Sequence, residues 1–414
     1  MNGSILIFFA VLVLSACLLA VAGCDSQRPS LNSNDSSQAR ERETSAPATS
    51  KSMPSANQGP HDFAAVDRLL ERAAPQLGGC ALILIKDDKV IYRKAFGQYE
   101  VDKVVPIASA SKWLSGALLM TLVDDGKLSL NDRVSKYLPE FAGDKAGITI
   151  RHLFAHTSGL PPEAGCRNDK RTTLERCVSE LARLRLKARP GEEFYYGGVS
   201  MHVGGRIAEV VSGKPWNELF VEKIAAPLGM TQTDFFAYGP TANPRPAGDA
   251  RSSIDDYGRF LQMILHRGTL DGKQILSAAT VAEMHRDQTD GARITYTIYE
   301  KHGGLDPALP RARYGIGVWR EKVDEGSNEL LEANSQGALG FSPWIDFKRN
   351  LVGVLSVQSS MSRVMPVYLE LKKEIQRIVP VSENASGWRK VRGTISECAG
   401  YVEFHFGLGA QRRS

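Results

Sequence analysis

The sequence predicts a single α+β domain whose sheet is built from both ends of the chain. Two apolar runs near the start of the folded part are joined by a short polar turn. Residues 109 to about 300 are mostly helical in pattern, and strand-like runs return only from residue 314. Because early and late strands bracket a helical insert, we expect them to lie in one sheet.

The elements follow in order along the chain. Apolar residues recur at helical spacing from Phe63 to Ala73, which predicts a first helix. The runs CALILIK (80–86) and VIYRKAF (90–96) flank a polar turn and predict a hairpin. The late part is expected to contain three strand-like runs and a final amphipathic helix. They cover 314–321, 329–340, 350–358 and 367–379.

Composition and charge limit the classes of function. The 414 residues are 43% hydrophobic and 23% charged, which is ordinary for a globular protein with a sizeable core. The net charge of +5 is mild and spread along the chain, so it favours neither nucleic acid nor a polybasic membrane patch. We expect no nucleic-acid partner.

Residues 1–23 resemble a bacterial lipoprotein signal peptide. An apolar run ends in Val-Ala-Gly immediately before Cys24, and small residues before a cysteine are typical of a site where the signal is cut and the thiol carries lipid. Residues 1–4 contain no Lys or Arg, and the run is long enough to remain as an uncleaved anchor. The cleavage pattern favours the lipoprotein, lipid-anchored on the periplasmic face of the cell envelope.

Residues 24–60 and 381–414 flank the expected domain, 61–380. The first segment is rich in Ser, Asn, Gln, Pro and charge, and cannot bury enough apolar surface to order itself. It is predicted to be a flexible tether that holds the domain off a membrane. The last segment contains Gly and Arg without a clear period, and its role is not predicted.

Two of the six cysteines lie in the signal segment or at position 24. Export implies an oxidising compartment, where disulfides form. Cys166 and Cys177 bracket a short charged segment and could close it as a loop. No CxxC or Cys/His cluster has the spacing of a zinc site, so no metal is expected.

Ser109 and Lys112 begin a helix that is apolar on nearly every side and therefore buried. Positions i and i+3 share a face, so the amine can reach the hydroxyl. A serine becomes a strong nucleophile when a base takes its proton, and a desolvated lysine can be that base. The alternative is an ordinary helix start, because Ser-x-x-Lys is common by chance and Ser111 is a second candidate.

Longer segments add context to this tetrapeptide. These segments are, in order, DGKLSLNDRVSKYLPEF, ITIRHLFAHTSGLP, PGEEFYYGG and SGKPWNELFVEKIAAPLGM. With them, the chain from about residue 62 to 380 resembles the serine β-lactamase and penicillin-binding-protein superfamily, specifically its class C and family VIII carboxylesterase branch. The resemblance implies a β-lactamase/transpeptidase-like fold: an antiparallel sheet flanked by N- and C-terminal helices, with an all-helical subdomain and the active site between them.

The resemblance also implies roles for three residues. Ser109 matches the acylated serine, Lys112 its lysine, and Tyr196 the tyrosine of the Tyr-x-Asn motif, whose phenol exchanges protons with the serine and the leaving group. We expect Lys112 to lower the pKa of this phenol electrostatically. The alternative for Tyr196 is an aromatic core residue. Tyr195 is a rival, but the spacing from Pro190 favours Tyr196.

Two departures from the family pattern bear on substrate choice. Gly198 stands where the motif has asparagine, so an amide that binds a substrate amide is missing. The third motif, usually Lys-Thr-Gly or His-x-Gly, begins here with Ser335, which carries no charge for a substrate carboxylate. Arg313 is a candidate to replace that cation.

The rest of the third motif, Gln336 and Gly337, is followed by Ala338. Gly337 would let the backbone approach closely, and the Ala338 and Ser109 amides could form an oxyanion hole. The alternative is an ordinary strand end without a ligand role.

His156 invites a Ser-His-Asp interpretation. No Gly-x-Ser-x-Gly elbow accompanies His156, and the resemblance gives it a structural place, so we expect a loop histidine with its hydrogen bonds satisfied. His202 is expected to pack near Tyr196, with lining of the pocket as the alternative.

The sequence therefore predicts an exported serine hydrolase that cleaves ester or small amide bonds through an acyl-enzyme on Ser109. The substrate is expected to be a small ester or amide, or a peptidoglycan-related molecule. We expect no cofactor, and we expect the protein to be a monomer. The alternatives are a β-lactamase, a D-alanyl carboxypeptidase or aminopeptidase, and a non-catalytic cell-wall-binding relative.

Overall fold

The computed structural model describes residues 61–296 and 313–382. The predicted signal peptide with Cys24, the tether and nearly all of the C-terminal tail lie outside the described residues. Within those two ranges, no helix combines the length and apolarity that crossing a membrane requires.

A six-stranded antiparallel sheet organises the domain, in the order β2-β1-β12-β11-β10-β9. Strand β1 pairs with β2 on one side and with β12 on the other, so the first hairpin is hydrogen-bonded directly to the last strand. The predicted α+β class with an antiparallel sheet is confirmed. The strands are β1 (Cys80–Lys86), β2 (Lys89–Phe96), β9 (Trp319–Val323), β10 (Leu330–Asn334), β11 (Ser342–Asp346) and β12 (Leu351–Ser356).

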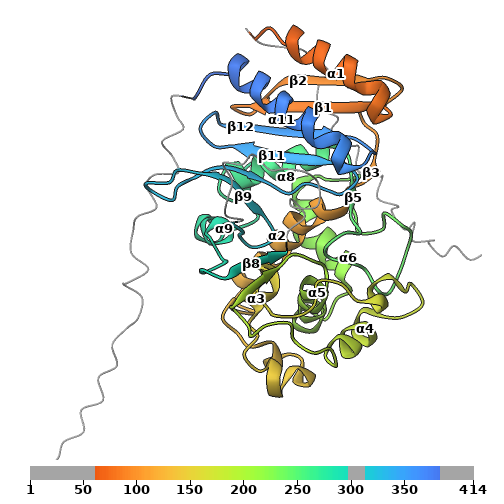
Figure 1. Cartoon of the computed structure of the whole chain (residues 1–414), viewed down its shortest axis with the longest axis vertical. Helices are drawn as coiled ribbons and strands as arrows, with labels where there is room; N and C mark the ends of the chain where they lie inside the picture. The colour runs from red at the N-terminus through yellow and green to blue at the C-terminus, as the bar shows by residue number, and fades with distance from the viewer. Residues whose placement is uncertain (1–60, 297–312, 383–414) are drawn as a thin grey trace, which may run out of the picture. The chain divides into compact units, whose positions relative to one another are not determined.

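The two terminal helices, α1 (Ala64–Leu77) and α11 (Met361–Ile378), pack against each other beside the sheet (Figure 1). Their apolar residues form one core cluster with side chains from one face of the sheet. Helix α8 (Ile254–Leu265) contacts β1, β11 and β12, and belongs to a second and larger cluster. The sheet is therefore covered on both faces.

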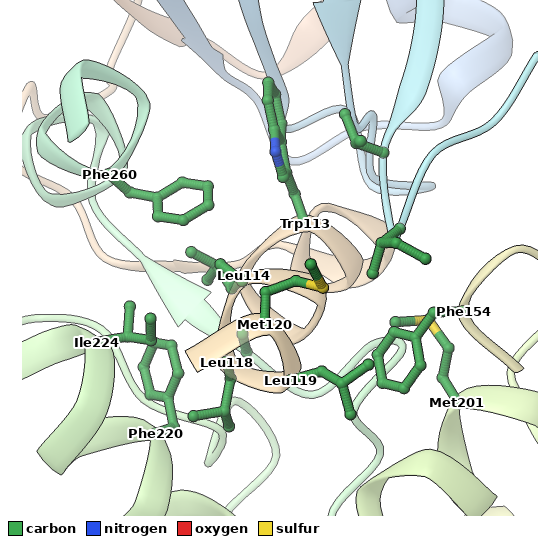
Figure 2. Close-up of a cluster of buried hydrophobic side chains, with 14 of the residues drawn as sticks. Trp113, Leu114, Leu118, Leu119, Met120, Phe154, Met201, Phe220, Ile224 and Phe260 are labelled. Carbon is green, nitrogen blue, oxygen red and sulfur yellow. The ribbon is translucent and has the colours of Figure 1, made fainter. Parts of the chain in front are cut away.

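Helix α2 (Ser111–Asp124) is buried along its first twelve residues, as its composition predicts. Its side chains project in all directions into the surrounding elements (Figure 2). Trp113 packs edge-on against Phe260 of α8, with ring centroids 6.0 Å apart. On another side, Leu119 points toward Phe154. The helix thus lies between the sheet and the helical part of the domain (Figure 1).

The remaining elements build the helical part and its connections. The helices are α3 (Ile150–Phe154), α4 (Leu174–Leu181), α5 (Val199–Ser212), α6 (Trp216–Phe220), α7 (Ala226–Leu228) and α9 (Ala278–His285), with a π-helical turn at Val221–Ala225. Short 3₁₀ turns are η1 (Ala108–Ala110), η2 (Val134–Lys136), η3 (Pro139–Phe141), η4 (Gly143–Lys145) and η5 (Gly165–Asn168). The short strands are β3 (Val105–Pro106), β4 (Glu193–Tyr195), β5 (Arg251–Ser252), β6 (Thr269–Leu270), β7 (Lys273–Gln274) and β8 (Arg293–Tyr296).

Four element predictions differ from the structure. The strand-like run predicted over 329–340 is a strand only over Leu330–Asn334. The strand expected from residue 314 begins only at Trp319, because the two preceding glycines pack closely against helices, Gly315 against α9 and Gly317 against α2. Gly317 has φ +77°, and a Cβ there would lie 2.2 Å from the Lys112 carbonyl oxygen. Strand β11 was not predicted; it contains Pro343, which cannot donate a ladder hydrogen bond. Helix α11 begins at Met361 rather than at 367.

Candidate active site

A tight turn before α2 presents Ser109. Ala108 has φ +44°, a left-handed conformation that is uncommon outside glycine. The hydroxyl of Ser111 donates to the Ala108 carbonyl (2.6 Å) and accepts from the Ala250 amide (3.0 Å), which holds this turn. Ser111 is fully buried, whereas Ser109 is partly exposed. Ser111 therefore has a structural role, and Ser109 is the accessible hydroxyl.

Lys112 points its amine at that hydroxyl. Its Nζ donates to Ser109 Oγ (3.1 Å) and to the Ala247 carbonyl (3.0 Å), and the residue is only 3% exposed. Burial and the nearby positive charge of Arg167 lower the pKa of Lys112 to about 7, while Glu163 acts in the opposite direction. Near neutral pH the amine can therefore exist without its proton and accept one from Ser109.

Tyr196, directly after β4, is the tyrosine at this site. It is 4% exposed, and its ring stacks on Trp319 with centroids 5.1 Å apart. The Lys112 Nζ lies 4.6 Å from the centroid of the same ring. The rival Tyr195 instead donates its hydroxyl hydrogen bond to Glu193 (2.5 Å).

The expected effect of Lys112 on the Tyr196 phenol is wrong. Burial raises the pKa of Tyr196, and hydrogen bonding with Ser109 and Trp319 offsets only part of this. Lys112 lies over the face of the ring and, with a pKa of about 7, carries only part of its charge at pH 7, so it does not outweigh the effect of burial on the phenol. Tyr196 consequently remains protonated near neutral pH and can donate a hydrogen bond or a proton.

The third-motif segment lies alongside the nucleophile turn. The Ser335 hydroxyl donates to the Ser109 carbonyl (3.2 Å). A Cβ at Gly337 would lie 2.2 Å from the Ile107 carbonyl oxygen, so only glycine fits this close approach. The segment therefore lies next to Ser109, at the candidate active site, and is not a strand end distant from it.

The oxyanion hole itself stays a prediction. Ala338 is exposed, and its amide makes no hydrogen bond to any described residue. Gln336 is buried, and its side-chain oxygen finds no partner within the part of the chain that the structure covers.

Gly198 stands where the family motif has asparagine, and another side chain fills the space beside it. A Cβ at Gly198 would lie only 1.7 Å from Nη2 of Arg167, so this guanidinium fills the space where a side chain would begin. The side chain of Arg167 is 7% exposed and forms an ion pair with Glu163. Arg167 is therefore the arginine next to Gly198. Arg313, the candidate for the missing cation of the third motif, donates to Asn328 (3.1 Å), and its role there stays a prediction.

Sequence reasoning missed Arg167, although two signals pointed toward it. Gly198 leaves room that another group must fill, and Arg167 directly follows a cysteine of the suspected pair. Cys166 and Cys177 do form a disulfide, with Cα atoms 5.4 Å apart. The bridge ties η5, which carries Arg167, to α4.

His156 differs from expectation. It is 1% exposed, but neither ring nitrogen has a hydrogen-bond partner among the described residues. Its ring lies 4.8 Å from that of Tyr196, and burial together with the charge of Lys112 keeps its pKa well below the usual value. This histidine is neutral and packed among aromatic rings, and no hydrogen bond joins it to Ser109.

His202 supports the loop next to the site. It is fully buried, and its Nε2 is hydrogen-bonded to Asn243 (2.8 Å). Asn243 in turn donates to the carbonyls of Cys166 (2.9 Å) and Asp169 (3.0 Å). These bonds hold the backbone on either side of Arg167, a role that the sequence did not predict. In the described ranges, no group of His, Cys, Asp and Glu could hold a metal ion.

A family model described as Beta-lactamase matches residues 66–366. The chain belongs to the beta-lactamase family. A solved putative beta-lactamase from Bacteroides dorei DSM 17855 is 34% identical, with a TM-score of 0.68 over 76% of this chain and 98% of that one. A solved family VIII carboxylesterase is 19% identical, with a TM-score of 0.58 over 75% and 99%, and shows the shared fold.

Two curated relatives match shorter segments. Protein flp of Staphylococcus aureus (strain N315) is 30% identical over 187 residues, which are 41% of this chain and 38% of that protein. The D-alanyl-D-alanine-carboxypeptidase/endopeptidase AmpH of Escherichia coli (strain K12) is 33% identical over 174 residues, 38% of this chain and 45% of that protein. The match thus spans less than half the length of each relative. The family makes this protein a β-lactamase-like serine hydrolase.

Proposed function

We propose that the protein cleaves esters or small amides through an acyl-enzyme on Ser109. One observation carries this proposal: a buried lysine, Lys112, whose pKa is lowered to about 7, donates to the partly exposed Ser109 hydroxyl at 3.1 Å. The Tyr196 phenol shares a hydrogen bond with the same hydroxyl. A nucleophile, a base and an acid therefore meet at one oxygen.

Acylation then proceeds in two proton movements. Ser109 Oγ attacks the substrate carbonyl carbon as Lys112 takes the hydroxyl proton, and the tetrahedral oxyanion accepts hydrogen bonds from the Ser109 and Ala338 amides. Tyr196 donates its proton to the leaving alcohol or amine as the bond to it breaks, and recovers a proton from Lys112. Water attacks the ester on Ser109 by the reverse route and releases the acid.

The leaving-group side favours neutral substrates. Ser335 is 1% exposed and uncharged, so a carboxylate there would lack the charge-assisted hydrogen bond that a lysine supplies. Such a bond contributes about 1.5–3 kcal/mol, which corresponds to about ten- to a hundredfold in rate. Short-chain esters do not need it. Ester turnover is therefore expected to exceed that of β-lactams and D-alanyl peptides.

A substrate panel tests this proposal. kcat/KM is measured for 4-nitrophenyl butyrate, nitrocefin and a D-alanyl-D-alanine peptide, and a fluorophosphonate probe reports the reactive serine. We expect the ester to be preferred, the probe to label Ser109, and Ser109→Ala to lose both signals. A wild-type protein that prefers nitrocefin overturns the substrate assignment, and labelling that persists in Ser109→Ala overturns the nucleophile.

A D-alanyl carboxypeptidase or endopeptidase is the second candidate. Its support is the 33% identity to the Escherichia coli enzyme over 174 residues. The same panel separates the candidates, because a peptidase would release D-alanine faster than it cleaves the ester. A non-catalytic cell-wall-binding relative would show no labelling at all.

We also propose that the protein is exported and lipid-anchored through Cys24. The small residues before this cysteine support the proposal, as does the disulfide between Cys166 and Cys177, which is typical of an oxidising compartment. Mass spectrometry of the mature protein is expected to find lipid on Cys24, and Cys24→Ala to release the protein from membranes. An intact, unmodified N-terminus would contradict the anchor.

A further inference from the structure

Arg167 has donor groups that the protein itself does not use. Nη1 is paired with Glu163. Nε is buried without a hydrogen-bond partner among the described residues, and no bond from Nη2 to a described residue is present. Nη2 is the nitrogen that faces Gly198. One edge of the planar guanidinium, formed by Nε and Nη2, is therefore left for another acceptor.

Burying a cation whose N–H donors lack acceptors is unfavourable in free energy. A guanidinium carries five N–H donors and keeps its charge, and a buried charge requires partners. Arg167 forms its ion pair with Glu163, whose side chain is 70% exposed, so water also solvates this carboxylate. No second carboxylate pairs with Arg167 in residues 61–296 or 313–382. An oxygen ligand that binds beside Gly198 would fill the edge.

This edge lies close to the reacting groups. Gly198 is two residues beyond Tyr196, and after burial the charge of Arg167 is the largest influence that lowers the pKa of Lys112. In the family pattern, the side chain at position 198 binds the acyl part of the substrate. Arg167 occupies that side chain's place, so the resemblance implies that it faces the acyl part of the substrate.

The backbone holds Arg167 in this position before any ligand binds. Cys166 is tied to α4 by its disulfide, and its carbonyl accepts from Asn243 (2.9 Å). The Pro162 carbonyl accepts from the Gly198 amide (2.9 Å), which joins the start of the loop to the motif. A group that is ordered in advance loses little conformational entropy on binding.

We propose that Arg167 binds a carboxylate on the acyl group of the substrate, in place of the asparagine amide that Gly198 lacks. A carboxylate matches the Nε–Nη2 edge, because two parallel N–H donors fit its two oxygens. This inference rests on the proposed function and specifies its substrate class: an ester with a neutral leaving group and an acid function on the acyl chain.

Matched esters test the proposal. One substrate is the 4-nitrophenyl monoester of adipic acid, and the other is the same ester with the far carboxyl methylated. Leaving group and chain are shared, so only the charge differs, and spontaneous hydrolysis is subtracted for each. For the wild type, kcat/KM is expected to be about ten- to a hundredfold higher for the acid.

Four variants locate the effect. Arg167→Met should abolish the preference, and Arg167→Lys should retain part of it because the charge remains without the fork. Glu163→Gln should increase the preference, since it removes a competing carboxylate. The matched control is Arg171→Met: Arg171 lies in the same loop, is 91% exposed at the side chain and pairs with Asp169. It should behave as the wild type.

The outcomes separate this inference from the proposed function. Loss of the Ser109-dependent reaction on both esters would refute the proposed function. A wild type that hydrolyses both esters equally, or an Arg167→Met variant that keeps the preference, refutes the role of Arg167 alone. Fluorophosphonate labelling and thermal melting check that each variant is folded. If Arg167→Met does not fold, an unchanged ratio in Glu163→Gln and Arg167→Lys still overturns the proposal.

Discussion

Lys112 and Lys372 are both buried in this domain, and their surroundings give them opposite properties. Lys112 in α2 is 3% exposed and donates to a hydroxyl and a carbonyl, both neutral. Lys372 in α11 is 7% exposed and pairs with two carboxylates, those of Glu321 (2.6 Å) and Glu332. Burial disfavours the ammonium at both sites.

The carboxylates decide the outcome. At Lys372 burial lowers the pKa, but the attraction of Glu321 and Glu332 outweighs it, and the pKa lies well above the ordinary value. At Lys112 nothing outweighs burial, and the pKa falls to about 7. A buried lysine is therefore a base where its partners are neutral, and a structural cation where they are charged.

Replacement of Lys112 should have the largest effect on activity. Lys112→Met removes the base that takes the Ser109 proton, so kcat/KM for 4-nitrophenyl butyrate is expected to fall by about a hundred- to ten-thousandfold. The variant should unfold at the same or a higher urea concentration, because the cost of burying an amine is removed. Activity within tenfold of the wild type would show that Lys112 is not the base.

Replacement of Lys372 should have the largest effect on stability. Lys372→Met leaves two buried carboxylates without their cation, which is expected to cost about 3–5 kcal/mol in the free energy of unfolding. Activity per folded molecule should stay unchanged, because α11 lies on the sheet face away from α2. Urea unfolding and active-site titration measure the two quantities, and a stable but inactive variant would contradict this separation.

The pH profile of acylation tests the pKa of Lys112. Only the neutral amine accepts the Ser109 proton, so kcat/KM should fall about tenfold per pH unit below about 7 and level off above it. Pre-steady-state acylation by a nitrophenyl ester between pH 5 and 9 measures this. If kcat/KM does not change with pH around 7, Lys112 does not have a lowered pKa, and the two lysines do not differ in the way described.

Stability should depend on pH with opposite signs at the two sites. The pKa of Lys112 is depressed from 10.5 to about 7, so the unfolded chain binds more protons in that window and this contribution to stability rises with pH, by at most about 1.4 kcal/mol per unit. The pKa of Lys372 is raised, so its contribution is complete below 10.5 and is lost as pH rises through the folded value. Comparing urea unfolding of Lys112→Met and the wild type from pH 7 to 10 isolates the first effect.

Replacement of His156 should have the smallest effect. Its ring makes no hydrogen bond to Ser109, and its backbone has φ +59°, which asparagine tolerates. His156→Asn is expected to retain kcat/KM within about tenfold of the wild type, with fluorophosphonate labelling of Ser109 intact. A loss as large as that of Lys112→Met would instead point to a histidine base.

Features that depend on short spacings could be predicted from the sequence. Ser109 and Lys112 are three residues apart at a helix start, and helix geometry alone brings the amine within reach of the hydroxyl. The first hairpin and the burial of α2 follow from the pattern of apolar residues in the same way. In each case the interacting groups are neighbours in the chain, so few arrangements compete.

Features that depend on contacts between distant segments were decided only by the tertiary structure. The guanidinium of Arg167 reaches Gly198 across 31 positions of the numbering, and no local pattern marks that approach. The strand start at Trp319 and the high pKa of the Tyr196 phenol likewise depend on what packs around them. Burial and charge at a point are sums over neighbours from the whole chain, and these neighbours are defined only when the chain has folded.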